Sequence, residues 1–201
     1  AIPGNHEYLK GVVKTLPEKW KTIFPNPQNG PARFLGTTYY VDFPHLRLIA
    51  LDTDGLHRMS DYTQVAFWLK KTLRDAGKKF TIVMMHHPVY STAEGRFNPF
   101  IWLAFHGAMR EADVVFSGHD HNYARHTEHY KARFWKKEEP TIFIGTNAST
   151  KKYPVKENNK YEASLSGEPV YEYILVTPTT LDISTYNLHS GEVIDEVEIV
   201  R

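Results

Sequence analysis

The chain has 201 residues, of which 41% are hydrophobic and 13% are aromatic, which is enough apolar material for one globular domain. Its 24 basic and 23 acidic residues give a formal net charge of +1, so the charge balance argues against a surface built to bind nucleic acid or an anionic membrane. The chain contains no cysteine, so any metal would take its ligands from His, Asn, Asp, Glu or Tyr.

The first predicted elements are a hairpin and a helix. Residues 37–52 alternate apolar and polar positions, which predicts two strands, the second of them, 46–51, largely buried. Asp61, followed three residues later by Gln, is typical of a helix start of the capping-box type. Apolar residues then recur at helical spacing up to Gly77, so we expect a helix over about 61–76.

A strand, a helix and a second strand follow in that order. Residues 79–85 form a short apolar, β-branched run that predicts a buried strand. Asn98 and Pro99 are a suitable cap and first-turn pair for a helix that ends near Ala112. Residues 114–116 predict another short buried strand, and the order of these three elements is typical of a crossover unit in a mainly parallel sheet.

The sequence of the last third of the chain predicts mostly β-structure. We expect a single domain over residues 1–201, with an α/β part over 1–130 and a mostly β tail over 131–201. Residues 151–168 are polar and interrupted by Pro and Gly, which predicts a long surface loop. The strands predicted in the tail are 141–144, 170–176, 180–187 and 193–200.

Polar clusters occur where predicted strands end or begin, which is where ligands commonly bind in α/β proteins. Neutral imidazole nitrogens and amide oxygens suit borderline divalent ions such as zinc, manganese or iron. The order of the three clusters along the chain is more informative than any one of them, since each alone is also typical of an ordinary polar turn. They are Gly4-Asn5-His6-Glu7, Val83-Met84-Met85-His86 and Gly118-His119-Asp120-His121.

In this order, the three clusters resemble the later motifs of the calcineurin-like metallophosphoesterase superfamily. The residues that follow His86 and His121 are most similar to those of purple acid phosphatases. The resemblance covers residues 4–125 well and the tail loosely, and it implies an α/β/β/α layered sandwich. It also implies a metal-dependent phosphoester hydrolase, a phosphatase or phosphodiesterase, in which a hydroxide activated by two metals attacks a phosphoester.

The resemblance also assigns roles to individual residues. It implies that Asn5, His86 and His119 bind one metal and that His121 binds the other, with the two ions drawn from iron, zinc or manganese. His6 would contact the phosphate and protonate the leaving alkoxide.

Further residues are candidates for orienting His6 or for contacting the substrate. Glu7 would orient His6, as a carboxylate often orients a catalytic imidazole. Tyr90, Tyr123 and Arg125 are candidate contacts to the substrate, although packing beneath the site loop explains them equally well. His87 receives no role. Many relatives of purple acid phosphatases are exported, so the resemblance suggests a secreted or periplasmic protein.

The family pattern begins with two aspartate motifs that have no counterpart in this sequence, which starts at Ala1. One of the missing aspartates would bridge the two metals. We therefore expect a domain truncated at its amino end, with impaired activity and with a tendency to associate with itself or with the missing segment. The alternative is a non-catalytic metal- or ligand-binding remnant of the fold, and metal stoichiometry distinguishes the two.

Overall fold

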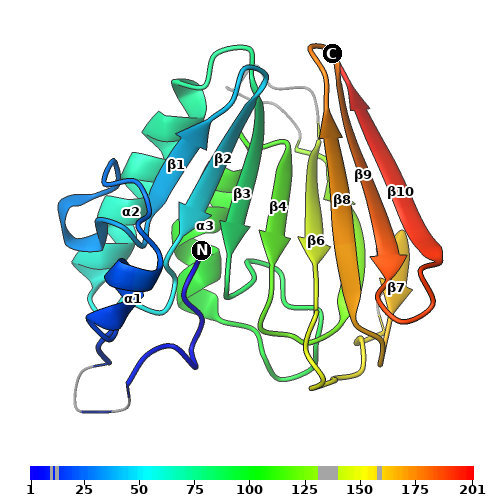
Figure 1. Ribbon diagram of the computed structural model, residues 1–201, viewed down its shortest axis with the longest axis horizontal. Helices are drawn as coiled ribbons and strands as arrows, with labels where there is room; N and C mark the ends of the chain where they lie inside the picture. The colour runs from blue at the N-terminus through cyan, green and yellow to red at the C-terminus, as the bar shows by residue number, and fades with distance from the viewer. Residues whose placement is uncertain (10, 12–13, 131–139, 158–159) are drawn as a thin grey trace.

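The computed structural model describes residues 1–9, 11, 14–130, 140–157 and 160–201. These residues form two β-sheets and a layer of helices (Figure 1). A short helix, α1 (Lys19–Ile23), and a 3-10 turn (Ala32–Phe34) precede the first sheet. No helix in the described ranges has the length and apolar character that a membrane span requires.

The larger sheet has seven strands and is mixed in direction. Its centre is parallel, because β2, β3, β4 and β6 all run the same way, whereas β1, β5 and β7 pair antiparallel with their neighbours (Figure 1). In spatial order the strands are β1 (Tyr39–Asp42), β2 (Leu46–Leu51), β3 (Phe80–Met85), β4 (Val114–Ser117), β6 (Thr141–Gly145), β5 (Tyr123–Glu128) and β7 (Ala163–Leu165).

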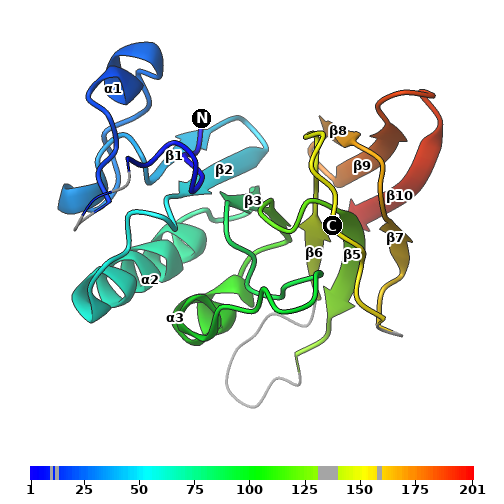
Figure 2. The ribbon, with the colours of Figure 1, turned by 90° about the horizontal axis from the view of Figure 1, so that it is seen from below.

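Two helices, α2 (Met59–Arg74) and α3 (Pro99–Met109), cover one face of this sheet (Figure 2). Val65 and Leu69 of α2 are fully buried and pack in one cluster with Ile101 of α3 and with residues of the central strands. The helix α2 begins two residues before the predicted start, and Asp61 is not its cap. Its carboxylate instead accepts the backbone N–H groups of His57 and Arg58 from one turn inside the helix.

The smaller sheet covers part of the opposite face. It consists of β8 (Val170–Val176), β9 (Thr180–Asn187) and β10 (Val193–Val200), paired antiparallel in the order β10, β9, β8 (Figure 2). Leu181 and Ile183 of β9 are buried against residues of β3, β4 and β6, so a second apolar core lies between the two sheets. The described residues therefore form helix, sheet and sheet layers, which confirms the predicted α/β class, although none of the described helices covers the outer face of the smaller sheet as the second helical layer of an α/β/β/α sandwich would.

Several boundaries differ from the sequence expectation. Residues 123–128 form β5, which was not predicted, because the segment YARHTE lacks an alternating apolar pattern and is buried through its neighbours β6 and β7. The predicted surface loop 151–168 contains the short strand β7. The strand predicted at 141–144 lies between β4 and β5, so the mostly β tail supplies an interior strand of the larger sheet.

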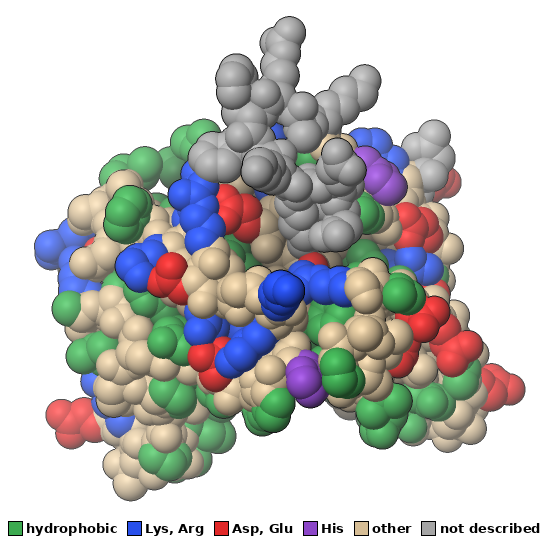
Figure 3. Space-filling model, turned by 90° about the horizontal axis from the view of Figure 1, so that it is seen from above, with side chains coloured by type: hydrophobic (Ala, Val, Ile, Leu, Met, Phe, Trp, Pro, Cys, Tyr) green, Lys and Arg blue, Asp and Glu red, His purple; other side chains and the backbone are tan. Residues whose placement is uncertain are grey.

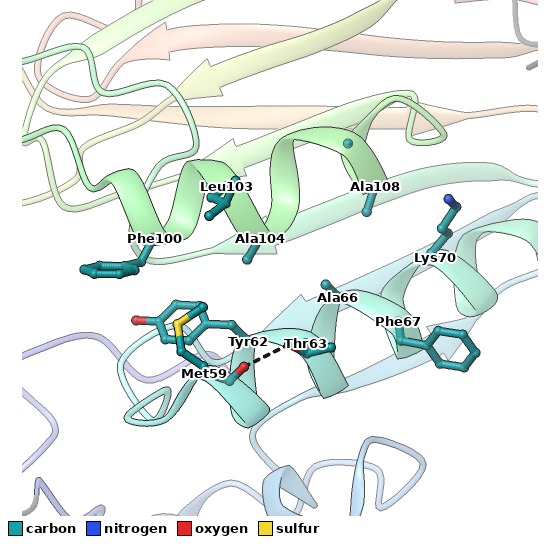
Figure 4. Close-up of a pocket in the computed structure, with 11 residues that line it drawn as sticks. Met59, Tyr62, Thr63, Ala66, Phe67, Lys70, Phe100, Leu103, Ala104 and Ala108 are labelled. Atoms are coloured by element: carbon teal, nitrogen blue, oxygen red, sulfur yellow. Dashed lines mark hydrogen bonds between the residues drawn. The ribbon is translucent and has the colours of Figure 1, made fainter. Parts of the chain in front are cut away.

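An apolar groove of about 510 Å³ runs between the two helices (Figure 4). Its rim includes exposed side chains of Met59, Phe67, Phe100 and Leu103. Basic and acidic side chains lie close together on the face at the amino ends of the parallel strands (Figure 3). One ion pair on this face joins Arg201 to Asp113. Because positive and negative side chains are intermixed, the visible part of this face forms no patch of a single charge (Figure 3).

Candidate metal centre

The parallel strands bring two of the three polar clusters to one edge of the sheet. Leu51, Met85 and Ser117 are aligned in register, so β2, β3 and β4 end at the same level (Figure 1). The histidines that follow β3 and β4 are tied together by a hydrogen bond from the Gly118 N–H to the His86 carbonyl (3.1 Å). The chain direction and register therefore place these loops side by side.

The amino-terminal turn supplies the third cluster. It is closed by a hydrogen bond from the Glu7 N–H to the Gly4 carbonyl (3.2 Å), and it lies directly against the His86 ring. A Cβ atom at position 4 would approach within 2.8 Å of two ring atoms of His86, so only glycine allows the turn to come this close.

Three predicted ligands meet at this edge. The Asn5 Oδ1 lies 2.9 Å from the His86 Nε2, and the His86 Nε2 lies 3.1 Å from the His119 Nδ1. Ligand atoms about 2.1 Å from one ion are ~3.0 to 3.4 Å apart in octahedral or tetrahedral geometry. The observed separations match the edges of such a polyhedron, so the residues present fit a divalent cation.

Burial keeps these imidazoles neutral. Loss of solvent lowers the pKa of His86 to about 4, with Glu7 opposing the change, and burial together with the Arg96 guanidinium lowers the pKa of His119 to about 3. A neutral imidazole offers a lone pair to a metal, whereas an imidazolium does not. The two rings are therefore ready to bind a cation at neutral pH without first releasing a proton.

The loop after β4 has an unusual backbone. Among the described residues, His119 (φ 67°) and His121 (φ 53°) are the non-glycine residues with positive φ. The Asp120 N–H donates to the Gly118 carbonyl (2.7 Å), which closes a tight turn centred on His119. Such backbone strain costs on the order of 1–3 kcal/mol and persists where the surroundings hold it in place.

Asp120 supplies much of that support. Its buried carboxylate accepts hydrogen bonds from the Ser91 hydroxyl (2.7 Å) and the Thr92 N–H (2.6 Å), and it pairs with Arg96 (3.2 Å). The Arg96 guanidinium also donates to the His119 carbonyl (2.9 Å). Asp120 therefore locks the loops after β3 and β4 together, and its carboxylate is fully engaged in doing so.

The remaining predicted ligand, His121, has a different environment. Its Nδ1 lies 2.8 Å from the Ser149 hydroxyl, and its ring meets the Tyr153 ring edge-on at 5.5 Å between centroids. Burial lowers its pKa, and the Lys151 ammonium lowers it further. His121 thus lies on the loop beside His119 but makes its hydrogen bond with the segment that follows β6.

The two predicted catalytic residues sit in the amino-terminal turn. Both His6 and Glu7 are exposed. The Glu7 carboxylate accepts the Gly4 N–H (2.7 Å), so in this structure it stabilises the turn rather than orienting the His6 ring. His6 lies next to Asn5 in the chain, and its catalytic role stays a prediction.

The three candidate substrate residues contact other parts of the protein. The Tyr90 hydroxyl lies 3.1 Å from Nδ1 of His106, and the Tyr90 ring packs edge-on against Phe143. Tyr123 is 1% exposed and donates to Asp195 (2.6 Å), and Arg125 binds the same carboxylate at 2.5 and 3.0 Å. The contacts of Tyr123 and Arg125 join the two sheets, whereas those of Tyr90 tie it to α3 and β6, and neither set supports a role in substrate binding.

Sequence reasoning left His87 without a role, yet its ring belongs to the cluster. One nitrogen from each of His86, His87 and His119 lies within 4.8 Å of the others. Burial lowers the pKa of His87 to about 3, with His119 adding to the effect. The signal in the sequence is the histidine pair directly after a buried strand, where strand alternation ends and adjacent side chains can share a side.

Comparisons with known proteins agree with this fold. A sequence model described as calcineurin-like phosphoesterase matches residues 1–123. The glycerophosphodiester phosphodiesterase GpdQ of Enterobacter lignolyticus is 26% identical over 129 residues, covering 60% of this chain and 44% of that protein.

Two solved structures share the fold. A purple acid phosphatase from yellow lupin (Lupinus luteus) seeds superposes with a TM-score of 0.60 and 18% identity, over 82% of this chain and 33% of that one. PhoD gives a TM-score of 0.57 and 9% identity, over 83% of this chain and 41% of that one. The chain thus spans less than half the length of these three relatives.

The matched segment contains the turn at Asn5, the end of β3 and the end of β4, which are the three places from which the predicted ligands come. Because the match also extends over more than half of the 201 residues, this chain belongs to the calcineurin-like phosphoesterase family.

Proposed function

We propose that this chain carries part of the active site of a metal-dependent phosphoester hydrolase. The observation that supports this most strongly is the convergence of Asn5 Oδ1, His86 Nε2 and His119 Nδ1, at separations of 2.9 and 3.1 Å. These three residues would hold one cation, and His121 would contribute to a second. When bound, such ions act as Lewis acids and make hydroxide available near neutral pH.

The chain's own residues would do the rest of the chemistry. His6 adjoins a ligand and is exposed, so it can contact a phosphoryl oxygen and deliver a proton to the leaving alkoxide. Arg96 is held by Asp120 next to His119, so it adds positive charge where an anionic substrate would approach. The name of the relative GpdQ favours a phosphodiester as the substrate over a phosphomonoester.

The test uses purified protein loaded with zinc or manganese. We expect measurable metal content and hydrolysis of bis(p-nitrophenyl) phosphate that depends on the metal. A His106→Gln variant is the control, because His106 is on α3 and hydrogen-bonds to Tyr90 rather than to the centre. A protein that binds no metal at micromolar concentrations would rule the proposal out.

A second candidate function is metal or ligand binding without turnover. It is favoured by the donor set, since the cluster found among the described residues consists of neutral imidazoles. Neutral ligands offset none of the charge of a dication, so two ions close together would repel one another strongly. A stoichiometry of one ion per chain with no hydrolysis would support this function, and two ions with turnover would support the hydrolase.

Association with a further segment is part of the same proposal. In the part of the chain that the structure describes, β10 pairs with β9 alone, and its other edge is open to another strand. Leu46 and Leu48 of β2 are only partly covered by the smaller sheet. Sedimentation velocity with and without metal would show whether the chain self-associates.

Export, which the resemblance suggests, remains a prediction that fractionation of the source cells would check.

A further inference from the structure

Next to the three proposed ligands lies a pair of residues with an unexplained arrangement, His87 and Asp54. The Nδ1 of His87 lies 3.2 Å from the Thr53 hydroxyl and 3.5 Å from Oδ2 of Asp54. The His87 ring centroid lies 4.3 Å from that of His119 and 5.1 Å from that of His86. One side of the ring therefore faces the loop after β2, and the ring stands beside the other two imidazoles.

Asp54 is unusual because its carboxylate is buried without a hydrogen bond. Its side chain has no exposed surface, and neither oxygen has a hydrogen-bond partner among the residues that the structure describes. The Lys14 ammonium lies 3.9 Å away, too far for a hydrogen bond. A buried carboxylate that accepts no hydrogen bond is costly, so an N–H on the nearby Nδ1 of His87 is well placed to satisfy it.

This arrangement selects one tautomer of His87. The ionised Asp54 carboxylate can only accept a hydrogen bond, so it favours a proton on Nδ1, and the Thr53 oxygen, which accepts the His87 backbone N–H (3.1 Å), has a second lone pair for the same proton. With the proton on Nδ1, the lone pair is on Nε2. A carboxylate behind a histidine in this manner fixes the ring and raises its basicity, as it does for metal-binding histidines in general.

We propose that His87 is a further ligand of the cation held by Asn5, His86 and His119, and that Asp54 is the carboxylate that positions it. The inference rests on the function proposed above. It gives the centre three imidazoles and one amide oxygen, with a negative charge just outside to offset part of the charge of the ion. Four protein ligands would close a tetrahedral zinc site, whereas a six-coordinate ion would keep positions for water and substrate.

The experiment measures cobalt and zinc binding rather than activity. Cobalt(II) is titrated into the wild-type protein and into His87→Gln, Asp54→Asn and the control His106→Gln, and its visible absorption reports the ligand set. Zinc affinity is measured by competition with a chromophoric chelator. We expect His87→Gln to weaken zinc binding by at least about 100-fold and to change the cobalt spectrum, and Asp54→Asn to weaken binding about 10-fold with little spectral change.

The outcomes separate this inference from the proposed function. If no protein binds metal, both are wrong. If wild-type and His87→Gln bind zinc equally well and give the same cobalt spectrum, His87 is not a ligand, although the hydrolase proposal stands. Should His87→Gln fail to fold, long-range ¹H–¹⁵N spectra of the wild-type protein decide the matter. We expect a proton on Nδ1 of His87 and a change in the ¹⁵N chemical shift of its Nε2 when zinc is added. A proton on Nε2, with chemical shifts that do not change on zinc addition, would overturn the inference.

Discussion

Two groups of polar side chains differ in how their hydrogen-bonding atoms are satisfied. One is the histidine cluster of His86, His87 and His119, and the other is the link between the two sheets, in which Tyr123 and Arg125 bind Asp195. Around Arg125, the Asp195 carboxylate accepts from the guanidinium and from Tyr123, and Glu162 also pairs with that guanidinium. In the histidine cluster, the Nε2 of His86 faces both another ring nitrogen and an amide oxygen.

The difference shows how to tell a structural cluster from a functional one. A group whose donors and acceptors all find protein partners has no capacity left for a ligand. In the histidine cluster, the nitrogen that lies between an amide oxygen and a second ring nitrogen can also offer its lone pair to a cation. The resemblance implies roles for residues of both clusters, and the contacts of Arg125 and Tyr123 give no support to theirs, whereas the metal-binding role of the histidines stays a prediction.

The largest effect should come from removing a ligand. We expect His119→Ala to weaken zinc binding by at least about 100-fold, since changes to outer residues alone cost 10- to 100-fold at metal sites. Competition with a chelator measures this, and circular dichroism checks the fold. Equal affinity in the variant would place the metal elsewhere.

The link between the sheets should instead affect stability. Asp195→Ala leaves the largely buried Arg125 charge without its main partner, and we expect a loss of about 3 kcal/mol in the free energy of unfolding, measured in urea. Lys71→Ala, which breaks an exposed pair on α2, is the matched control and should cost about 0.5 kcal/mol. A change in zinc affinity in Asp195→Ala would show that the two clusters are coupled.

Acid should weaken the metal-free protein through the histidine cluster. Burial lowers the pKa of His86 to about 4 and of His119 to about 3, below the ordinary value of 6.5. Their neutral forms are favoured in the folded state, so stability is retained above pH 6.5 and is lost as the pH falls towards 4. Burial raises the pKa of Asp54 to about 7, which acts in the opposite direction over much of this range.

The histidine contribution is isolated with a double variant, His86→Gln with His119→Gln. We expect its urea midpoint to fall less than that of the wild-type protein between pH 7 and pH 4.5. Parallel pH curves for the two proteins would mean that these rings titrate normally.

The smallest effect concerns Tyr90. Replacing it with Phe removes the hydroxyl that lies 3.1 Å from Nδ1 of His106, and we expect a loss of about 1 kcal/mol in unfolding free energy with KM unchanged. Urea denaturation and phosphodiester kinetics measure the two quantities. A rise in KM without loss of stability would instead make Tyr90 a substrate contact, as the resemblance implies.

Local patterns in the sequence predicted most elements close to their observed bounds. The apolar spacing of α2 and the β-branched run of β3 indicate which faces are buried, and the bounds of both elements were predicted to within two residues. The strand β5 was missed because its segment has no pattern of its own, and it is ordered by pairing with β6 and β7. The strand, helix and strand order along the chain also predicted that His86 and His119 follow strands of the same parallel sheet.

The sequence by itself determined the type of fold and the family, and it predicted candidate metal ligands. Only the tertiary structure decided which atoms meet: Asn5 with His86, 81 residues apart, and Arg125 with Asp195, 70 residues apart. Only the structure also shows that the Asp120 carboxylate binds the loop after β3 and that the His87 ring lies with those of His86 and His119. The physical reason is that periodicity records burial, whereas contacts between distant residues depend on strand register and loop conformation, which local sequence does not encode.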